Sequence, residues 1–167
     1  MESDSSENRV AYLEQQLRLL VKANHQLNHE LSLPVISETL VEYGLKLVNA
    51  TAGATGMLED GQMLFDSYYK DGNWKPIHYA FKPGQSIPGW MNGNLIPYIS
   101  NDALNDPEIS LEMQEAFEFI TLISIPIIDN QGTLIGCLEL LDKAEGEQFD
   151  AHDMDMLEGL AAGAAVA

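Results

Sequence analysis

The sequence contains few basic residues, a single cysteine and no long apolar run, and each shortage excludes a class of function. Only 8 lysines and arginines stand against 26 acidic residues, so the net charge is −18. A surface this acidic repels phosphodiester backbones and anionic lipid headgroups. We therefore expect neither nucleic-acid binding nor direct membrane contact. The same acidity also suits an ordinary solvated cytosolic surface.

Cys137 is the only cysteine, which excludes an intramolecular disulfide and a cysteine-rich zinc or iron–sulfur site. No apolar run approaches the roughly 18 residues of a membrane span. The segment from Met1 to Asn8 is polar and acidic, unlike a signal peptide. These features predict a cytoplasmic location. The sequence stops at Ala167 inside an apolar helical pattern without a cap or breaker, so we expect the closing helix to be truncated.

A heptad pattern follows residues 1–8, which we expect to form a disordered tail. Between residues 9 and 32 apolar side chains recur at alternating spacings of three and four, as in a coiled-coil dimerisation helix. Asn24 occupies an a position of this repeat, where paired asparagines favour a parallel, in-register dimer. A helix packed on its own domain would fit the same pattern. The expected dimer seam consists of Val10, Leu13, Leu17, Leu20, Asn24, Leu27 and Leu31.

In residues 33–167, turn and helix-breaking residues separate segments that fit one α+β domain. Pro34 separates the first helix from a second amphipathic helix, which we expect to end at the Ala52-Gly53 pair. Asp-Gly turns then separate three strand-like segments, and two strongly apolar strands further on are expected at the centre of the sheet. The expected strands span residues 56–58, 63–69, 74–81, 97–100, 120–128 and 133–141, with helices at 89–91 and 111–119.

The final helix has a clear start in the sequence. Asp150 and Asp153 are spaced to cap it, and Leu157 and Leu160 lie on its apolar side. Small residues from Ala161 onward allow a neighbouring helix to approach closely. We therefore expect a central antiparallel sheet with helices packed on one face, preceded by a long coiled-coil helix.

Four stretches of this domain, taken in order, resemble the GAF domain family. The first is Gly-Gln-Ser-Ile-Pro-Gly-Trp-Met at residues 84–91, and the second is Asp-Ala-Leu-Asn-Asp-Pro at residues 102–107. The third is the apolar hairpin with Ser-Ile-Pro-Ile-Ile at residues 124–128, and the fourth runs from Phe149 to the Ala-rich end. The resemblance covers residues 33–167. It implies a GAF/PAS-like fold and a sensor role in a bacterial signalling protein.

In GAF domains, ligands occupy a cavity between the sheet and the loops around residues 85–120. An aromatic plate with a few convergent polar groups suits a small planar ligand. The resemblance implies no cofactor, and it places a candidate ligand pocket at Ile87, Pro88, Trp90, Asp102, Ala103, Ser124 and Glu139.

The signature of GAF domains that bind cyclic nucleotides is matched only in part. The family has an Asn-Lys pair, a Phe and an Asp-Glu pair, where this chain has Asp142, Lys143, Phe149, Asp153 and Met154. Two polar groups of the signature are therefore missing, which makes a cyclic nucleotide a less favoured ligand. We expect Lys143 and Asp153 to form a structural ion pair between strand and helix.

Other cofactors and chemistries fit less well. His78 lies in a strand, and a haem ligand there is not favoured. His25 and His29 lack a third metal ligand on their helix face. Cys137 sits inside an apolar strand, unlike the cysteine that attaches a bilin. The free methionine sulfoxide reductases of this fold need two thiols. No metal site and no catalytic residue is expected.

Two functions remain in view. The first is a non-catalytic sensor that binds a small molecule and passes a conformational signal through the N- and C-terminal helices of a homodimer to an output domain in the same polypeptide, such as a two-component kinase. The second is a ligand-free dimerisation and spacer module. A third alternative, an unrecognised hydrolase or reductase, would depend on Asp102 and Glu139.

Overall fold

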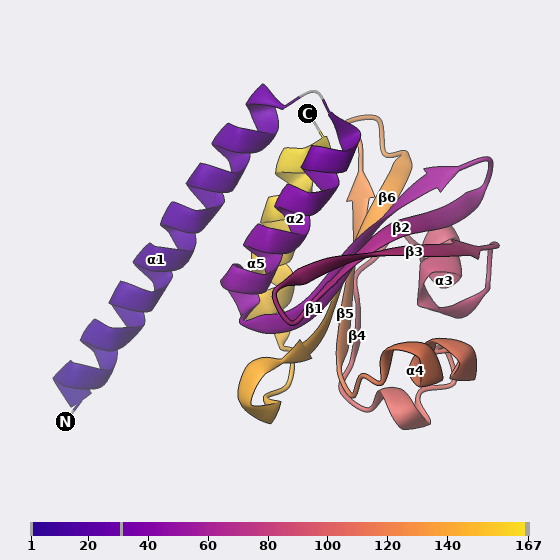
Figure 1. Ribbon diagram of the computed structural model, residues 1–167. Helices are drawn as coiled ribbons and strands as arrows, with labels where there is room; N and C mark the ends of the chain where they lie inside the picture. The colour runs from indigo at the N-terminus through magenta and orange to yellow at the C-terminus, as the bar shows by residue number, and fades with distance from the viewer. Residues whose placement is uncertain (1, 31, 166–167) are drawn as a thin grey trace.

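The computed structural model describes residues 2–30 and 32–165, with side chains from Ser5 onward. An antiparallel sheet divides the domain into two layers (Figure 1). The elements are α1 (Glu2–His29), α2 (Leu33–Val48), β1 (Ala50–Glu59), β2 (Gln62–Lys70), β3 (Asn73–Phe81), α3 (Ser86–Asn94), β4 (Tyr98–Ser100), α4 (Leu111–Phe117), β5 (Leu122–Ile128), β6 (Leu134–Lys143) and α5 (Ala151–Ala165), with single 3-10 turns at Ala103–Asn105 and Ala144–Gly146. The α+β fold expected from the sequence is confirmed.

The strand order of the sheet is β3-β2-β1-β6-β5-β4, so β1 and β6 form its centre rather than β5 and β6. The sequence pattern misplaced the centre because β1 starts at Ala50 and runs through the expected break at Ala52-Gly53. A Cβ atom at Gly53 would lie 2.6 Å from a methyl group of Leu140. The small residues therefore permit close packing inside a strand, and they do not mark a turn.

Strand β6 contributes side chains to both layers. Leu138 and Leu140 pack with α2 and α5 in the helical layer, where Leu157 and Leu160 are also buried. The alternate residues of β6, including Cys137, face the second layer. Figure 1 shows α1, α2 and α5 on one side of the sheet, and the short α3 and α4 on the other. The long helices thus share one face, and the opposite face is covered by short helices and loops.

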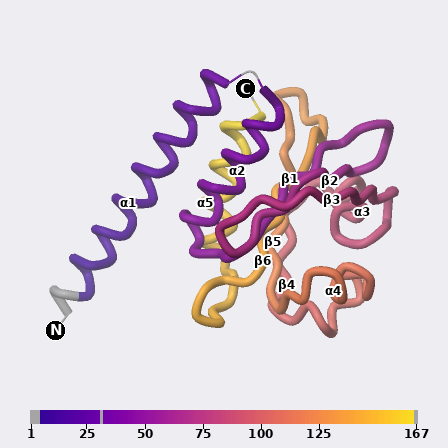
Figure 2. Tube along the Cα trace, in the orientation of Figure 1, coloured from indigo at the N-terminus to yellow at the C-terminus, as the bar shows by residue number. Residues whose placement is uncertain are grey.

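Helix α1 begins at Glu2, so residues 2–8 are helical and the expected disordered tail is wrong for them. Its first half projects beyond the domain, whereas the end of α5 lies close to the start of α2 (Figure 2). Gln16 fixes the second half of α1, because its Nε2 donates to the Leu47 carbonyl at 2.9 Å and its Oε1 lies 2.8 Å from His152 Nε2. No helix in the described ranges is long and apolar enough to cross a membrane.

The expected dimer seam is split between two environments. Val10 and Leu17 are 55% and 62% exposed, whereas Leu27 is fully buried within the chain's own helical layer. Asn24 faces α5, since a Cβ atom at Gly163 would lie 2.0 Å from its Oδ1. The other seam residues are Leu13, which is exposed, Leu20, which is partly buried, and Leu31, which lies outside the described residues.

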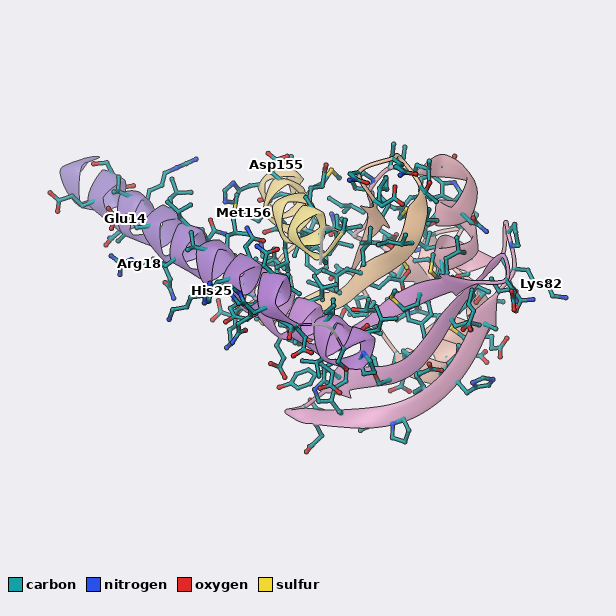
Figure 3. All side chains as sticks on the ribbon, turned by 90° about the horizontal axis from the view of Figure 1, so that it is seen from above. Glu14, Arg18, His25, Lys82, Asp155 and Met156 are labelled. Atoms are coloured by element: carbon teal, nitrogen blue, oxygen red, sulfur yellow. The ribbon has the colours of Figure 1, made fainter. Side chains whose placement is uncertain are left out.

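The seam therefore does not lie on one free face of α1. The side of α1 that points away from α5 carries Glu14, Arg18 and His25, as Figure 3 shows in relation to Asp155 and Met156 of α5. Packing within the chain buries the C-terminal part of the heptad pattern, and only its N-terminal part remains exposed to a partner helix.

Two carboxylates and one lysine join the end of β6 to the start of α5. The Lys143 ammonium lies 2.8 Å from Asp153 Oδ2, and both side chains are largely buried. Burial alone would lower the pKa of Lys143, but the hydrogen bond and charge of Asp153 outweigh it and raise that pKa. Asp150 and Asp153 also accept each other's backbone N–H, at 2.9 and 3.0 Å, as a capping pair.

We expect Asp153→Asn to lower the free energy of unfolding by about 3 kcal/mol, because it leaves the Lys143 charge buried without its counter-ion. Asp155→Asn is the matched control: it removes the same charge from an exposed position of the same helix, and should change stability by less than about 0.5 kcal/mol. Urea denaturation of the two variants measures the difference. If the two variants have equal free energies of unfolding, the ion pair does not stabilise the fold.

Candidate functional site

A cavity lies between the sheet and the layer formed by α3 and α4. Its volume is about 50 Å³, and its wall is largely apolar. The lining residues come from five strands, from α3 and α4 and from adjoining loops: Ala54, Phe65, Tyr68, Ile77, Tyr79, Phe81, Ser86, Ile87, Pro88, Ile109, Met113, Phe117, Phe119, Leu122, Glu139 and Leu141. We refer to this space as the sheet cavity.

One wall of the sheet cavity is aromatic. The ring of Phe117, at the end of α4, meets Tyr68 and Tyr79 edge to face with centroid separations of 4.8 and 5.4 Å. Phe65 and Phe81 on β2 and β3 meet at 5.7 Å. Such edge contacts place the rings of neighbouring strands and of α4 against one another, and they fix the shape of the wall.

A tight turn before α3 forms the end of the cavity. Gly89 permits this turn, since a Cβ atom there would lie 2.2 Å from the Lys82 carbonyl oxygen. The turn places Ile87 and Pro88 in the cavity wall. Ser86 then links the turn to α4, because its Oγ accepts the Ser110 backbone N–H at 3.2 Å.

Glu139 is the acidic residue of the cavity wall. In the sheet it stands opposite Ser124 of β5 and Ala54 of β1. Glu139 Oε1 and Ser124 Oγ are both buried, and neither has a hydrogen-bond partner among the described residues. Burial raises the pKa of Glu139 to about 7, although the nearby Ser124 hydroxyl favours the ionised form. The carboxyl group is therefore close to half-ionised at neutral pH.

Cys137 and Tyr68, two further titratable groups on this side of the sheet, are neutral at that pH. Burial, followed by the nearby Glu139 charge, raises the pKa of the Cys137 thiol well above 9.0. Burial is also the main reason why the pKa of Tyr68 rises to about 12. Cys137 is fully buried and unreactive in this state, since a thiolate is the reactive form.

The candidate pocket residues named from the sequence are not all brought together. Ile87, Pro88 and Glu139 line the sheet cavity, and Ser124 is buried beside Glu139. Trp90 is absent from the cavity lining, and its ring packs on Tyr98 at a centroid distance of 5.0 Å.

Asp102 and Ala103 also lie away from the sheet cavity. Asp102 accepts a hydrogen bond from Asn105 Nδ2 at 2.9 Å, within its own loop. Ala103 is buried and lines a separate surface hollow near Asp106 and Gln114. The Asp-Ala-Leu-Asn-Asp-Pro motif of residues 102–107 therefore stabilises its own loop and does not line the sheet cavity.

The aromatic wall was missed from the sequence. Along β2 and β3 the buried Phe65 and Phe81 alternate with more exposed residues, so the two-residue period of a strand with one buried face was visible in the sequence. That signal could not be assigned to a cavity, because it does not tell which layer covers the aromatic face. Among the described residues, no group of three or more His, Cys, Asp or Glu side chains could hold a metal ion.

Comparison with known families identifies the class of this domain. Residues 30–167 match the family model of the GAF domain. Because this match covers well over half of the chain, the protein belongs to the GAF domain family, a family of regulatory and sensor domains. Among curated protein sequences, none matches this chain significantly.

Solved structures share the same fold. The GAF domain of a phosphoenolpyruvate-protein phosphotransferase from Coxiella burnetii has a TM-score of 0.74 and 20% identity, with 90% of each chain covered. The A. aeolicus nlh2 GAF domain in an inactive state has a TM-score of 0.71 and 14% identity, with 92% of this chain and 95% of that chain covered. The free methionine-R-sulfoxide reductase of Neisseria meningitidis has a TM-score of 0.73 and 13% identity, with coverage of 90% and 86%. At these identities the likeness establishes the fold alone.

The raised pKa of Glu139 predicts a specific pH dependence of stability. Its folded pKa of about 7 lies above the ordinary 4.5, so folding favours the protonated form, and wild-type stability falls as pH rises between these values. Glu139→Gln cannot ionise. Relative to wild type, we expect this variant to gain up to about 3 kcal/mol of unfolding free energy between pH 4.5 and pH 8. Urea denaturation at both pH values tests this, and parallel pH profiles would contradict it.

Proposed function

We propose that this chain is a non-catalytic sensor domain that binds a small molecule in the sheet cavity and passes a conformational signal through the helices of a homodimer. The observation that carries the proposal is the cavity itself, an apolar space closed by α3 and α4 with a buried carboxyl group in its wall. Few convergent polar groups in an apolar pocket are the usual make-up of a small-molecule site.

Strand β6 provides the physical connection between the cavity and the helices. Glu139 faces the cavity, while its neighbours Leu138 and Leu140 pack under α2 and α5. The same strand ends at Lys143, which is paired with Asp153 of α5. A ligand that shifts β6 would therefore bias the position of α5, provided that it binds one arrangement better than the other.

Helix α5 in turn contacts α1, which carries the open apolar stripe. His152 of α5 meets Gln16 of α1 at 2.8 Å. The stripe consists of Val10, Leu13, Leu17 and Val21, all of them exposed. Its spacing suits a partner helix, so we assign the homodimer contact to this stripe, between Val10 and Val21 of α1. An output domain in the same polypeptide would receive the signal from the helices.

The absence of catalysis is part of the proposal. The chain has one cysteine, which is fully buried with a raised thiol pKa, so thiol chemistry of the free methionine-R-sulfoxide reductase kind lacks its two reactive groups. The alternative remains a ligand-free dimerisation and spacer module. The small volume of the cavity favours this alternative, because drug-sized ligands need roughly 300 Å³ or more. A cyclic nucleotide would fit only if the cavity opened.

A binding screen separates the two functions. Thermal shift and calorimetric titration against cyclic nucleotides and small metabolites should give at least one ligand of the wild-type chain. Ala54→Val narrows the cavity and should weaken that ligand about tenfold or more, whereas Ala162→Val, at an exposed position of α5, should leave it unchanged. The spacer function is favoured if no metabolite binds, or if both variants bind it equally.

The dimer contact has its own test. We expect the wild-type chain to sediment as a dimer at micromolar concentrations and Leu17→Glu to sediment as a monomer, because a charge in the seam opposes association. Gln26→Glu introduces the same charge at another exposed position of α1 and should remain a dimer. A monomeric wild type, or a dimeric Leu17→Glu variant, would rule out this interface.

A further inference from the structure

The chemistry of the sheet cavity restricts the ligand that it can accept. The cavity combines an aromatic wall with a carboxyl group whose Oε1 atom is buried and lacks a hydrogen-bond partner within the described residues. A buried ionised group is costly unless a counter-charge or hydrogen bonds compensate it. The wall supplies no such counter-charge, because none of its lining residues is basic.

Basic side chains are also scarce in the rest of the domain. The buried ion pair of the domain joins Lys143 to Asp153 and does not involve Glu139. The net charge of −18 adds a negative potential around the domain, which attracts cations and repels anions. When the Glu139 carboxyl group is ionised, a positive charge beside it has to come from outside the cavity wall.

Aromatic rings surround the same space. Phe117 meets Tyr68 and Tyr79 on one side, and Phe65 and Phe81 extend the wall along β2 and β3. The faces of such rings attract organic cations, and cages of aromatic side chains bind quaternary ammonium groups. A carboxylate and several aromatic rings around one small space are complementary to a cation that carries methyl or methylene groups.

From these contacts we infer that the sheet cavity binds a small organic cation, a protonated or quaternary amine, with its charge beside Glu139 and its alkyl groups against the aromatic wall. This inference rests on the proposed sensor function and names the class of its ligand. A volume of about 50 Å³ holds about three to five water-sized groups. Tetramethylammonium, a nitrogen with four methyl groups, is a compact probe of this class.

Phe117 lies between the cavity and an outer hollow that Lys70 and Lys75 also line. This open hollow of about 340 Å³ shares Tyr68, Ile77, Tyr79 and Phe117 with the sheet cavity, so these side chains lie between the two spaces. Phe117 is the last residue of the short helix α4. A ligand with a longer substituent on its nitrogen would extend past this ring toward the outer hollow.

Three compact probes test the role of charge: tetramethylammonium, neutral tert-butanol of similar size, and the somewhat larger anion trimethylacetate. Calorimetry or ligand-observed NMR should show tetramethylammonium binding to the wild-type chain about tenfold or more tightly than either of the others. Glu139→Gln should weaken tetramethylammonium by about tenfold or more and leave tert-butanol unchanged. Glu158→Gln, which removes one exposed acidic charge from α5, should bind all three probes as wild type does.

Phe117→Leu is a second variant that keeps an apolar side chain but removes the ring face. It should weaken tetramethylammonium by about threefold or more without weakening tert-butanol, and it keeps the test informative if Glu139→Gln unfolds. Tighter binding of tert-butanol or trimethylacetate would show that the cavity does not prefer a cation, and it would leave the proposed small-molecule site intact. Failure of all three probes to bind would also overturn the cation, and the metabolite screen would then decide the sensor function separately.

Discussion

The pairing of β1 with β6 at the centre of the sheet is the constraint on which the other parts depend. Because side chains alternate along β6, Leu138 and Leu140 enter the helical layer, while Cys137 and Glu139 enter the layer of the cavity. Gly53 of β1 leaves room for the side chain of Leu140, its partner on β6. A one-residue change of register would exchange the two layers and place a carboxyl group in the helical core.

Local signals in the sequence were enough for most of the elements. The capping pair of Asp150 and Asp153 depends on residues three positions apart, and the structure has it as the spacing predicts. A short helix was expected at residues 89–91, and the structure has a longer one there, α3. The start of β1 was misread, because Ala52 and Gly53 look like a break unless the packing of Leu140 against them is known.

Packing between distant segments could not be read from one sequence. A heptad pattern has the same period whether its partner is another chain or the chain's own α5, and Leu20, Asn24 and Leu27 turned out to face inward. The candidate site shows the same limit. Glu139 lies in the wall of the sheet cavity, whereas Trp90 packs on Tyr98 outside it, because the side on which a residue of a short helix packs depends on the layer above it.

Under the proposed function, the carboxyl group of Glu139 also sets a scale for the response to a bound cation. A rise in the pKa of Glu139 from 4.5 to about 7 corresponds to about 3 kcal/mol of unfavourable burial of its charge. A cation that fully compensates this charge recovers about that much free energy, in addition to its contacts with the aromatic wall. If the two arrangements of β6 differ in how well they bury Glu139, the ligand can change their ratio by about a hundredfold. This is sufficient to switch a domain whose two states are closely balanced, and it requires no additional binding site.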